Sequence, residues 1–181
     1  MEELKQLSDN VYEQIKDFDW RNLTEEQESL VDKLILDKEL KSNYKEYGLC
    51  EKCKQPNIYF GWCQCYAKIF QQNFKNWTSG NSDVDKFIQK TQLRARCHEE
   101  VIEWIEYDKF ENIEYLAKGG FGTTFKAIWK DGQIKSWDSE NNQWKREIKY
   151  NFGLPVALKR LHNSQNITEF LSEVRYLQCL S

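Results

Sequence analysis

Four cysteines that lie close together in the sequence could hold a metal ion. Cys50 and Cys53 form a Cys-x-x-Cys pair, and Cys63 and Cys65 form a Cys-x-Cys pair that follows after nine intervening residues. Thiolates are ligands for zinc, and two thiols separated by two residues can chelate one ion through a tight turn. Zinc ribbons usually carry Cys-x-x-Cys in both halves. The second pair here has only one residue between its cysteines, so its two sulfurs would chelate an ion through a shorter loop.

Two interpretations of these cysteines stay open. In the first, four thiolates hold one zinc ion, and Cys97 or His98 completes the site if Cys63 or Cys65 cannot. In the second, the thiols are unliganded and lie buried in a small aromatic cluster. That cluster would consist of Tyr59, Phe60 and Trp62.

A glycine-rich segment further along the chain could bind phosphate. Residues 116–127 read Leu-Ala-Lys-Gly-Gly-Phe-Gly-Thr-Thr-Phe-Lys-Ala and lie between two predicted strands. A dinucleotide-binding glycine motif should lead into a helix, and a Walker loop needs Gly-Lys-Ser/Thr, so neither fits this segment. A glycine-rich hairpin over phosphates fits, because glycines let the backbone approach a nucleotide closely.

A lysine and a glutamate follow at positions that suit the same chemistry. Lys159 ends the predicted strand Val-Ala-Leu-Lys, although a solvent-exposed strand lysine would give the same pattern. Glu173 lies in a predicted helix over residues 168–180, on the flank of its apolar face, and Glu169 is a rival on the same helix.

Together these residues resemble the amino-terminal lobe of a protein kinase domain of the tyrosine-kinase-like group. Gly119 and Gly122 take the second and third glycine positions of the family's loop, Ala117 replaces the first glycine, and Thr124 replaces the valine. The resemblance implies ATP as ligand, with Mg²⁺ in the parent kinase, and an ion pair between Glu173 and the phosphate-contacting lysine. The implied ATP-binding residues are Leu116, Ala117, Lys118, Gly119, Gly120, Phe121, Gly122, Thr124, Ala157 and Lys159.

The cysteine segment extends the resemblance to a fungal kinase-like family with a cysteine-containing leader. The match to that leader covers residues 62–63, 70–74 and 77–81. In that family an Ile-x-Tyr-Asp-x-Phe segment joins the leader to the glycine loop, and residues 105–110 match it. Family members often carry Trp-Cys-x-x-Cys, so Cys63-Gln64-Cys65 is one residue shorter. The resemblance covers roughly residues 45–181.

A catalytic-loop Asp, an Asn for metal and a D-F-G segment cannot be placed in the chain. We therefore expect the chain as given to be inactive as a phosphotransferase, although the parent activity would be phosphoryl transfer from ATP to protein hydroxyls in signalling. A fragment of a full kinase is favoured over a degenerate relative. The alternative function is an inactive remnant that serves as a zinc-dependent or helical protein-interaction module.

The elements that must position these residues predict an α+β fold. Helices are expected within residues 1–23, from Thr24 to about Lys41, from Ser82 and around residues 101–105, with a loop-rich module over 48–66. Strands are expected at 111–116, 123–129 and 154–161, with an extra ribbon at 134–137 and 144–148. The predicted units are a helical region (1–47), a Cys-rich zinc module (48–81), a helical linker (82–109) and a partial kinase lobe of antiparallel strands plus one helix (110–181).

The charge and the apolar content of the chain limit the kinds of partner that we expect. The 26 basic and 29 acidic residues give a formal net charge of −3, so no single-sign field favours nucleic acid or an anionic membrane. The charged N-terminus lacks a secretory apolar run, and no stretch approaches the ~20 apolar residues of a membrane span. We therefore expect a cytoplasmic protein whose cysteines are reduced thiols or metal ligands. A protein substrate or partner is expected, of a kind that the sequence does not specify.

Overall fold

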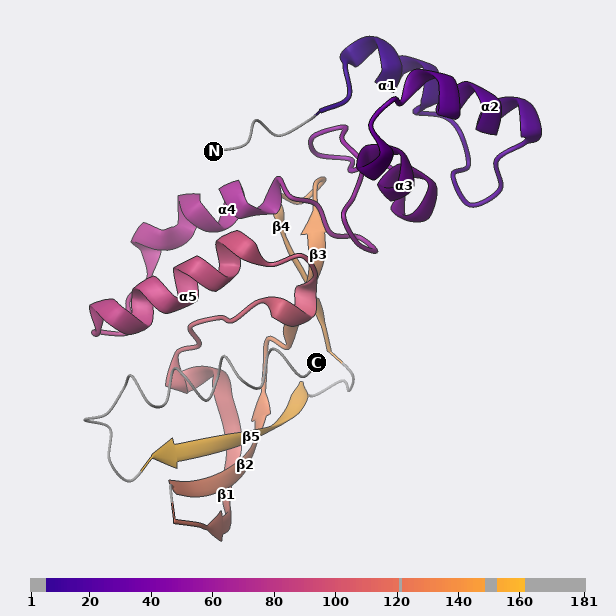
Figure 1. Cartoon of the computed structure of the whole chain (residues 1–181). Coiled ribbons are helices and arrows are strands. Elements are labelled where there is room, and N and C mark those ends of the chain that lie inside the picture. Colours follow the sequence, from indigo (N-terminus) through magenta and orange to yellow (C-terminus); the bar gives the residue numbers. More distant parts are fainter. Residues whose placement is uncertain (1–5, 121, 149–152, 162–181) are drawn as a thin grey trace.

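A computed structural model describes residues 6–120, 122–148 and 153–161. The fold is α+β, as predicted: helices fill the first half of the chain and antiparallel strands follow (Figure 1). The helices are α1 (Asp9–Ile15), α2 (Glu25–Leu34), α3 (Lys38–Tyr47), α4 (Tyr66–Asn73) and α5 (Ser82–Arg94), with 3-10 turns η1 (Phe74–Asn76), η2 (His98–Glu100) and η3 (Tyr107–Lys109). The strands are β1 (Phe110–Lys118), β2 (Gly122–Trp129), β3 (Gln133–Asp138), β4 (Gln143–Glu147) and β5 (Leu154–Leu161).

The first three helices begin at side chains that cap their free N–H groups. Thr24 forms a capping box at the start of α2, as its sequence pattern predicts. The prediction of one helix from Thr24 to about Lys41 is wrong, because α2 ends at Leu34 and Ile35 is extended. Asp37 then accepts the amides of the first turn of α3, and such local hydrogen bonding favours a new start over continuation.

These helices enclose a core of their own. Its buried residues are Leu7, Ile15, Val31, Ile35 and Tyr44. The Tyr44 hydroxyl, at the centre, donates a hydrogen bond of 3.1 Å to the carbonyl oxygen of Ile15. Burial raises the pKa of Tyr44 to about 12, because the phenolate would lose its hydration.

A second core surrounds the cysteine segment. Its buried residues are Cys50, Trp62, Cys63, Tyr66, Ile69, Phe70 and Ile134. Helices α4 and α5 lie side by side (Figure 1). Helix α5 starts at Ser82, as predicted, and its N-cap is Asn81. The predicted helix around residues 101–105 is wrong: this segment has no regular structure and is flanked by η2 and η3.

The strands form two antiparallel sheets. One has the order β1-β2-β5, and the other is the β3–β4 hairpin, so the five predicted strand regions are confirmed with shifts at their ends. The hairpin interrupts the chain between β2 and β5. The predicted helix over 168–180, with Glu173 and Glu169, lies outside the described residues, as does Phe121. Among the described residues, no helix has the length and apolar character needed to span a membrane.

Candidate functional site

The Cys50–Cys53 pair sits in a tight backbone loop. The amide of Cys50 donates to the carbonyl of Gln55 (2.8 Å), and the amide of Lys54 donates to the carbonyl of Cys50 (2.8 Å). Lys54 adopts φ 64°, which turns the chain back on itself after Cys53. An isolated bridge between Leu49 and Pro56 closes the loop. The two thiols therefore project from one turn, as the Cys-x-x-Cys spacing predicts.

The Cys63–Cys65 pair lies where a second turn runs into a helix. Gly61 (φ 62°) allows the tight turn between Tyr59 and Trp62. Cys65 is the N-cap residue of α4, and its backbone amide donates to Cys63 Sγ over 3.5 Å. The positive end of the helix dipole at this position favours a thiolate.

The two pairs meet. Among the described residues, the group that could hold a metal consists of Cys50, Cys53, Cys63 and Cys65, and their Sγ atoms all lie within 4.8 Å of one another. The Sγ–Sγ distance is 3.7 Å between Cys50 and Cys65 and 3.3 Å between Cys53 and Cys63. A disulfide needs about 2.05 Å, so these thiols are free. Four soft donors at these separations can hold a metal ion.

Electrostatics also favour a cation between the sulfurs. Hydrogen bonds from the Cys53, Cys63 and Cys65 thiols lower the pKa of the Cys50 thiol. The hydrogen bond to Cys50 is in turn the main cause that raises the pKa of the Cys63 thiol, and the same partner raises that of Cys65. Four thiols this close cannot all ionise alone, whereas a divalent cation would compensate their charges.

The two reserve ligands lie elsewhere. Cys97 does not belong to the four-sulfur group. His98, 7% exposed, receives a hydrogen bond from Lys135 Nζ (2.8 Å to Nε2). Burial, and then the charge of Lys135, lowers the pKa of His98, so its ring is neutral at pH 7. The predicted aromatic cluster forms in part: Trp62 is buried beside the thiols and Tyr59 packs against the same core, whereas Phe60 contacts Tyr59 but is 58% exposed.

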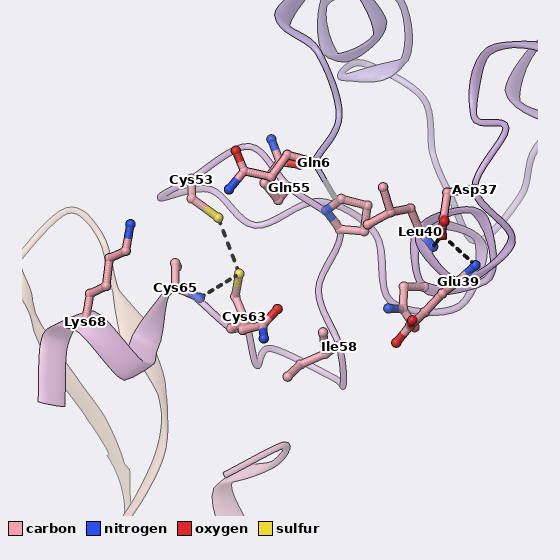
Figure 2. A pocket seen from close by; sticks show the side chains of 13 residues that line it. Gln6, Asp37, Glu39, Leu40, Cys53, Gln55, Ile58, Cys63, Cys65 and Lys68 are labelled. Carbon is pink, nitrogen blue, oxygen red and sulfur yellow. Dashed lines mark hydrogen bonds between the residues drawn. The ribbon is translucent and has the colours of Figure 1, made fainter. Parts of the chain in front are cut away.

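A cavity of about 570 Å³ opens beside the thiols, between α3 and the cysteine segment (Figure 2). Cys53, Cys63 and Cys65 contribute to its lining, with Lys68 on the α4 side and Glu39 on the α3 side. Figure 2 shows the Cys53 and Cys63 sulfurs facing each other at its edge. The candidate metal centre is therefore accessible from this side.

The predicted phosphate-binding residues occupy one end of the β1-β2-β5 sheet. The amide of Gly119 donates to the carbonyl of Gly122 (2.8 Å), which closes the turn between β1 and β2. The strand register aligns Ala117 with Thr124 and Thr124 with Lys159. Residues directly opposite each other on paired strands project from the same face, so these three side chains share one face next to the glycine turn.

The remaining predicted ATP-binding residues lie around the same turn. Ala157 is two residues from Lys159 on β5 and shares its face, and it is exposed. Leu116 and Lys118 are exposed on β1, and Gly120 has open space where a Cβ atom would lie. The described members thus lie near the glycine turn but not all on one face, because Lys118 pairs with Thr123, which alternates with Thr124.

Sequence reasoning missed how the β3–β4 hairpin is used. We expected only an extra ribbon at 134–137 and 144–148 and assigned it no role, but Trp144 on β4 stacks on Phe70 (4.6 Å between ring centroids) and on Trp62 (5.8 Å). The hairpin therefore completes the core next to the cysteines. Its tryptophans, Trp137 and Trp144, were the available signal, because an exposed ribbon rarely carries two such side chains without a surface on which they pack.

Comparisons of this chain with protein-family models, with curated proteins and with solved structures find no match.

Proposed function

We propose that the chain binds one zinc ion through four cysteine thiolates, and that this zinc-stabilised leader precedes the ATP-binding opening of a protein kinase domain. The zinc site is supported by the sulfur positions, and the nucleotide site by the strand register. The two sites are tested separately because either could exist without the other.

One observation carries the zinc assignment: the four sulfurs fit a tetrahedral centre. A zinc–sulfur bond of about 2.3 Å in a tetrahedron places the sulfurs about 3.8 Å apart. The Sγ–Sγ distances of 3.7 Å (Cys50–Cys65) and 3.3 Å (Cys53–Cys63) are close to this separation, and the remaining sulfur pairs lie within 4.8 Å of each other. A donor set of four thiolates is typical of structural zinc sites and leaves no open coordination position for catalysis. We therefore assign the ion a structural role.

The test is the metal content of the purified chain. Native mass spectrometry should find one zinc per chain, and Cys63→Ser should reduce this markedly because Cys63 is buried within the group. Cys97→Ser is the matched control, since this thiol lies outside the group and should leave the zinc content unchanged. Equal zinc contents in Cys63→Ser and the unaltered chain would refute the four-sulfur site.

The nucleotide assignment depends on the row of side chains across the sheet. Ala117, Thr124 and Lys159 lie on adjacent strands and share one face beside the glycine turn. An ammonium group in that row, next to backbone that glycine keeps free of Cβ atoms, suits the phosphates of a nucleotide. With the sequence resemblance, this arrangement favours ATP over other anions and a kinase lobe over a simple hairpin.

An ATP titration tests the assignment. Mg·ATP should raise the melting temperature of the zinc-loaded chain saturably, and Lys159→Ala should abolish the shift because the phosphates lose their cation. The matched control is Lys126→Ala, which removes an exposed lysine that shares the face but pairs with Glu114 (2.9 Å). A shift that persists in Lys159→Ala, or one absent in the unaltered chain, would contradict ATP binding at this face.

A zinc-dependent interaction module is the second candidate. It is favoured by the cavity beside Cys53, Cys63 and Cys65, because a partner segment could enter there without displacing the core. Binding of partners to the zinc-loaded chain that Lys159→Ala leaves intact would support this candidate over the nucleotide site.

A further inference from the structure

The β3–β4 hairpin lies in the chain between β2 and β5, two of the three strands that carry the proposed nucleotide residues. It leaves the sheet after Trp129, at the end of β2, and the chain returns at Leu154, which pairs with Trp129. The glycine turn lies at the other end of β2. The hairpin therefore begins at the end of the sheet that is remote from the glycine turn, where Trp129 of β2 and Leu154 of β5 are paired.

The apolar face of the hairpin packs on the cysteine segment. Ile134 is 2% exposed, and Trp137 packs edge-on against Trp144 (5.0 Å between centroids). Trp144 stacks on Trp62 and Phe70 and meets Tyr66 edge-on at 5.6 Å. Large aromatic side chains dominate the packing of a core, so docking of the hairpin depends on where Trp62 and Tyr66 are held.

The metal ligands flank the docking residues directly. Trp62 precedes Cys63, and Tyr66 follows Cys65. Between Tyr47 and Tyr66, a stretch that the structure describes throughout, the chain forms no helix and no paired strand beyond isolated bridges. A segment without regular structure has fewer backbone hydrogen bonds than a helix or a sheet, so the cross-link that a metal supplies should contribute much of its order. Loss of the ion would therefore free Trp62 and Tyr66, against which Trp144 packs, to move.

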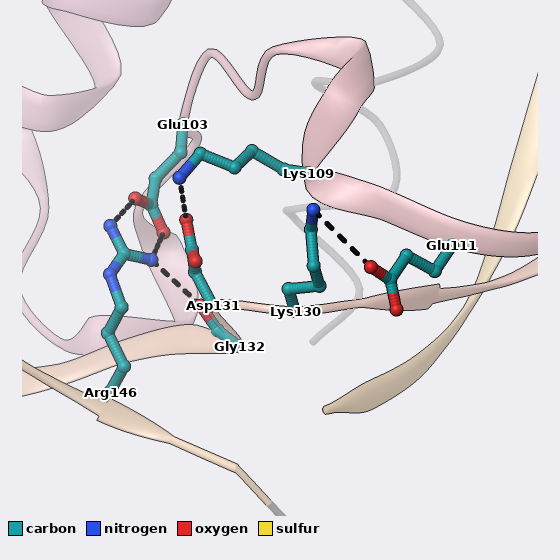
Figure 3. Close-up of polar contacts among 7 residues, drawn as sticks. All are labelled: Glu103, Lys109, Glu111, Lys130, Asp131, Gly132 and Arg146. Atoms are coloured by element: carbon teal, nitrogen blue, oxygen red, sulfur yellow. Dashed lines mark hydrogen bonds and ion pairs between the residues drawn. The ribbon is translucent and has the colours of Figure 1, made fainter. Parts of the chain in front are cut away.

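Ion pairs connect the base of the hairpin to the start of the sheet (Figure 3). Arg146 on β4 donates to both carboxylate oxygens of Glu103, at 2.6 and 3.2 Å, and to the carbonyl oxygen of Gly132 at 2.8 Å. Lys109, just before β1, pairs with Asp131 at 3.1 Å. The Glu103 and Arg146 side chains are only 14% and 28% exposed, so this contact holds β4 firmly to the segment that precedes β1 and to the turn that follows β2.

The backbone at the base of the hairpin, around Gly132, is tightly packed. Gly132 adopts φ 68°, and a Cβ atom there would lie within 2.2 Å of the carbonyl oxygen of Glu147. The turn after β2 is therefore packed against the end of β4, so displacement of the hairpin moves the end of β2, with which Leu154 of β5 is paired.

We infer that the β3–β4 hairpin transmits the state of the zinc centre to the sheet of the proposed nucleotide site, so that zinc occupancy controls the order of β2 and β5. This inference rests on the proposed zinc site. By thermodynamic reciprocity, a nucleotide that orders the sheet also strengthens zinc binding by the same factor. The zinc site then regulates the nucleotide face from a distance, with the tryptophan contacts and the Arg146–Glu103 pair as the physical link.

Hydrogen exchange with mass spectrometry tests the link on the full chain. Exchange in peptides from β2 and β5 is compared before and after a chelator removes zinc, with the metal content measured in every sample. We expect zinc removal to raise this exchange by about 5- to 150-fold, the usual range of coupling between sites. Helix α2 serves as the internal reference, because its core is separate.

Two tryptophan variants test whether the contacts of Trp144 carry the link from the zinc site to β2 and β5. Zinc-loaded Trp144→Ala should already show the raised exchange in β2 and β5, and chelation should add little. Trp104→Ala is the matched control, since Trp104 donates to Glu106 (2.9 Å) and belongs to neither core. Arg146→Lys provides a second interruption if Trp144→Ala fails to fold.

The outcomes separate the two proposals. A chain that binds no zinc refutes both the zinc site and the link. A chain that binds zinc but shows unchanged exchange in β2 and β5 after chelation refutes the link alone. The link is also refuted if α2 loses protection to the same extent, which indicates global unfolding, or if zinc-loaded Trp144→Ala and Arg146→Lys behave like the unaltered chain.

Discussion

A methyl group at Gly48 should weaken the junction between the N-terminal helices and the cysteine segment. Gly48 adopts φ 69° and ψ −162°, a conformation that costs a residue with a Cβ atom about 2 kcal/mol. A Cβ atom there would lie 2.3 Å from Trp20 Nε1 and 2.5 Å from Trp20 Cδ1. Displacing the indole from its packing adds about 2 kcal/mol, so we expect Gly48→Ala to lose about 4 kcal/mol in total.

The backbone at Gly48 cannot move to relieve this overlap. Its amide donates to the carbonyl of Tyr44 (2.9 Å), and its carbonyl accepts the amide of Asn57 (2.9 Å). The first bond ends α3 and the second closes the loop around the Cys50 pair, so a shift would sacrifice one of them. A loss of about 4 kcal/mol is a large part of the roughly 5–15 kcal/mol that stabilises an ordinary domain.

Urea denaturation of the zinc-loaded chain, followed by far-ultraviolet circular dichroism, measures the loss. Gly80→Ala is the matched control: Gly80 also has a positive φ (79°), but no atom lies within 4 Å of its Cβ position. It should therefore lose only the backbone contribution, about 1–2 kcal/mol. If both variants lose the same free energy of unfolding, the Trp20 contact does not contribute and the reasoning is wrong.

Three further predictions concern buried polar groups. Tyr44→Phe should lower the free energy of unfolding by about 1 kcal/mol in urea titrations at pH 7, because a buried hydrogen bond is lost. Since folding raises the pKa of Tyr44 from 10 to about 12, the unaltered chain should lose about 2 kcal/mol more than Tyr44→Phe as the pH rises from 10 to 12. Glu103→Gln should lower the free energy of unfolding by about 2 kcal/mol at pH 7, because the hydrogen bonds from Arg146 lose their charged acceptor. In a double-mutant cycle, the same substitution should cost less when Arg146→Met is already present. Because folding lowers the pKa of His98, the unfolded state binds the extra proton first, so stability should fall as the pH drops below about 6.5; His98→Gln should flatten this slope.

The sequence specified those parts of the structure that depend on local patterns. The β-rich composition on both sides of the glycines predicted β1 and β2, and the structure places the turn between them. The Cys-x-x-Cys spacing predicted a loop from which both thiols project, and the Cys63–Cys65 pair joins them. Such features follow from residue spacing along a few turns or strand positions, so no long-range contact is needed to anticipate them.

The parts that the sequence did not specify depend on contacts between distant residues. The capping of α3 by Asp37 is a local signal, but the extended backbone at Ile35 also places this side chain, 2% exposed, in the core of the N-terminal helices. Likewise, Trp144 follows Trp62 by more than eighty residues, and only the folded chain stacks the two rings. Tertiary packing of this kind overrides local propensity and has no local signature.

The short Cys63–Cys65 spacing is compatible with a four-sulfur centre because a helix replaces the second loop. In a Cys-x-x-Cys loop, two intervening residues make the turn that brings both sulfurs to the metal. Here Cys65 has helical backbone angles (φ −62°, ψ −17°), and the amide of Tyr66 already donates to the carbonyl of Cys63 (3.0 Å). The chain therefore turns through the first residues of α4 instead, and Cys65 points back toward Cys50 from the helix start. The same turn inserts Tyr66 into the aromatic core, so the four-cysteine group and the docking surface for the β3–β4 hairpin arise from one local structure.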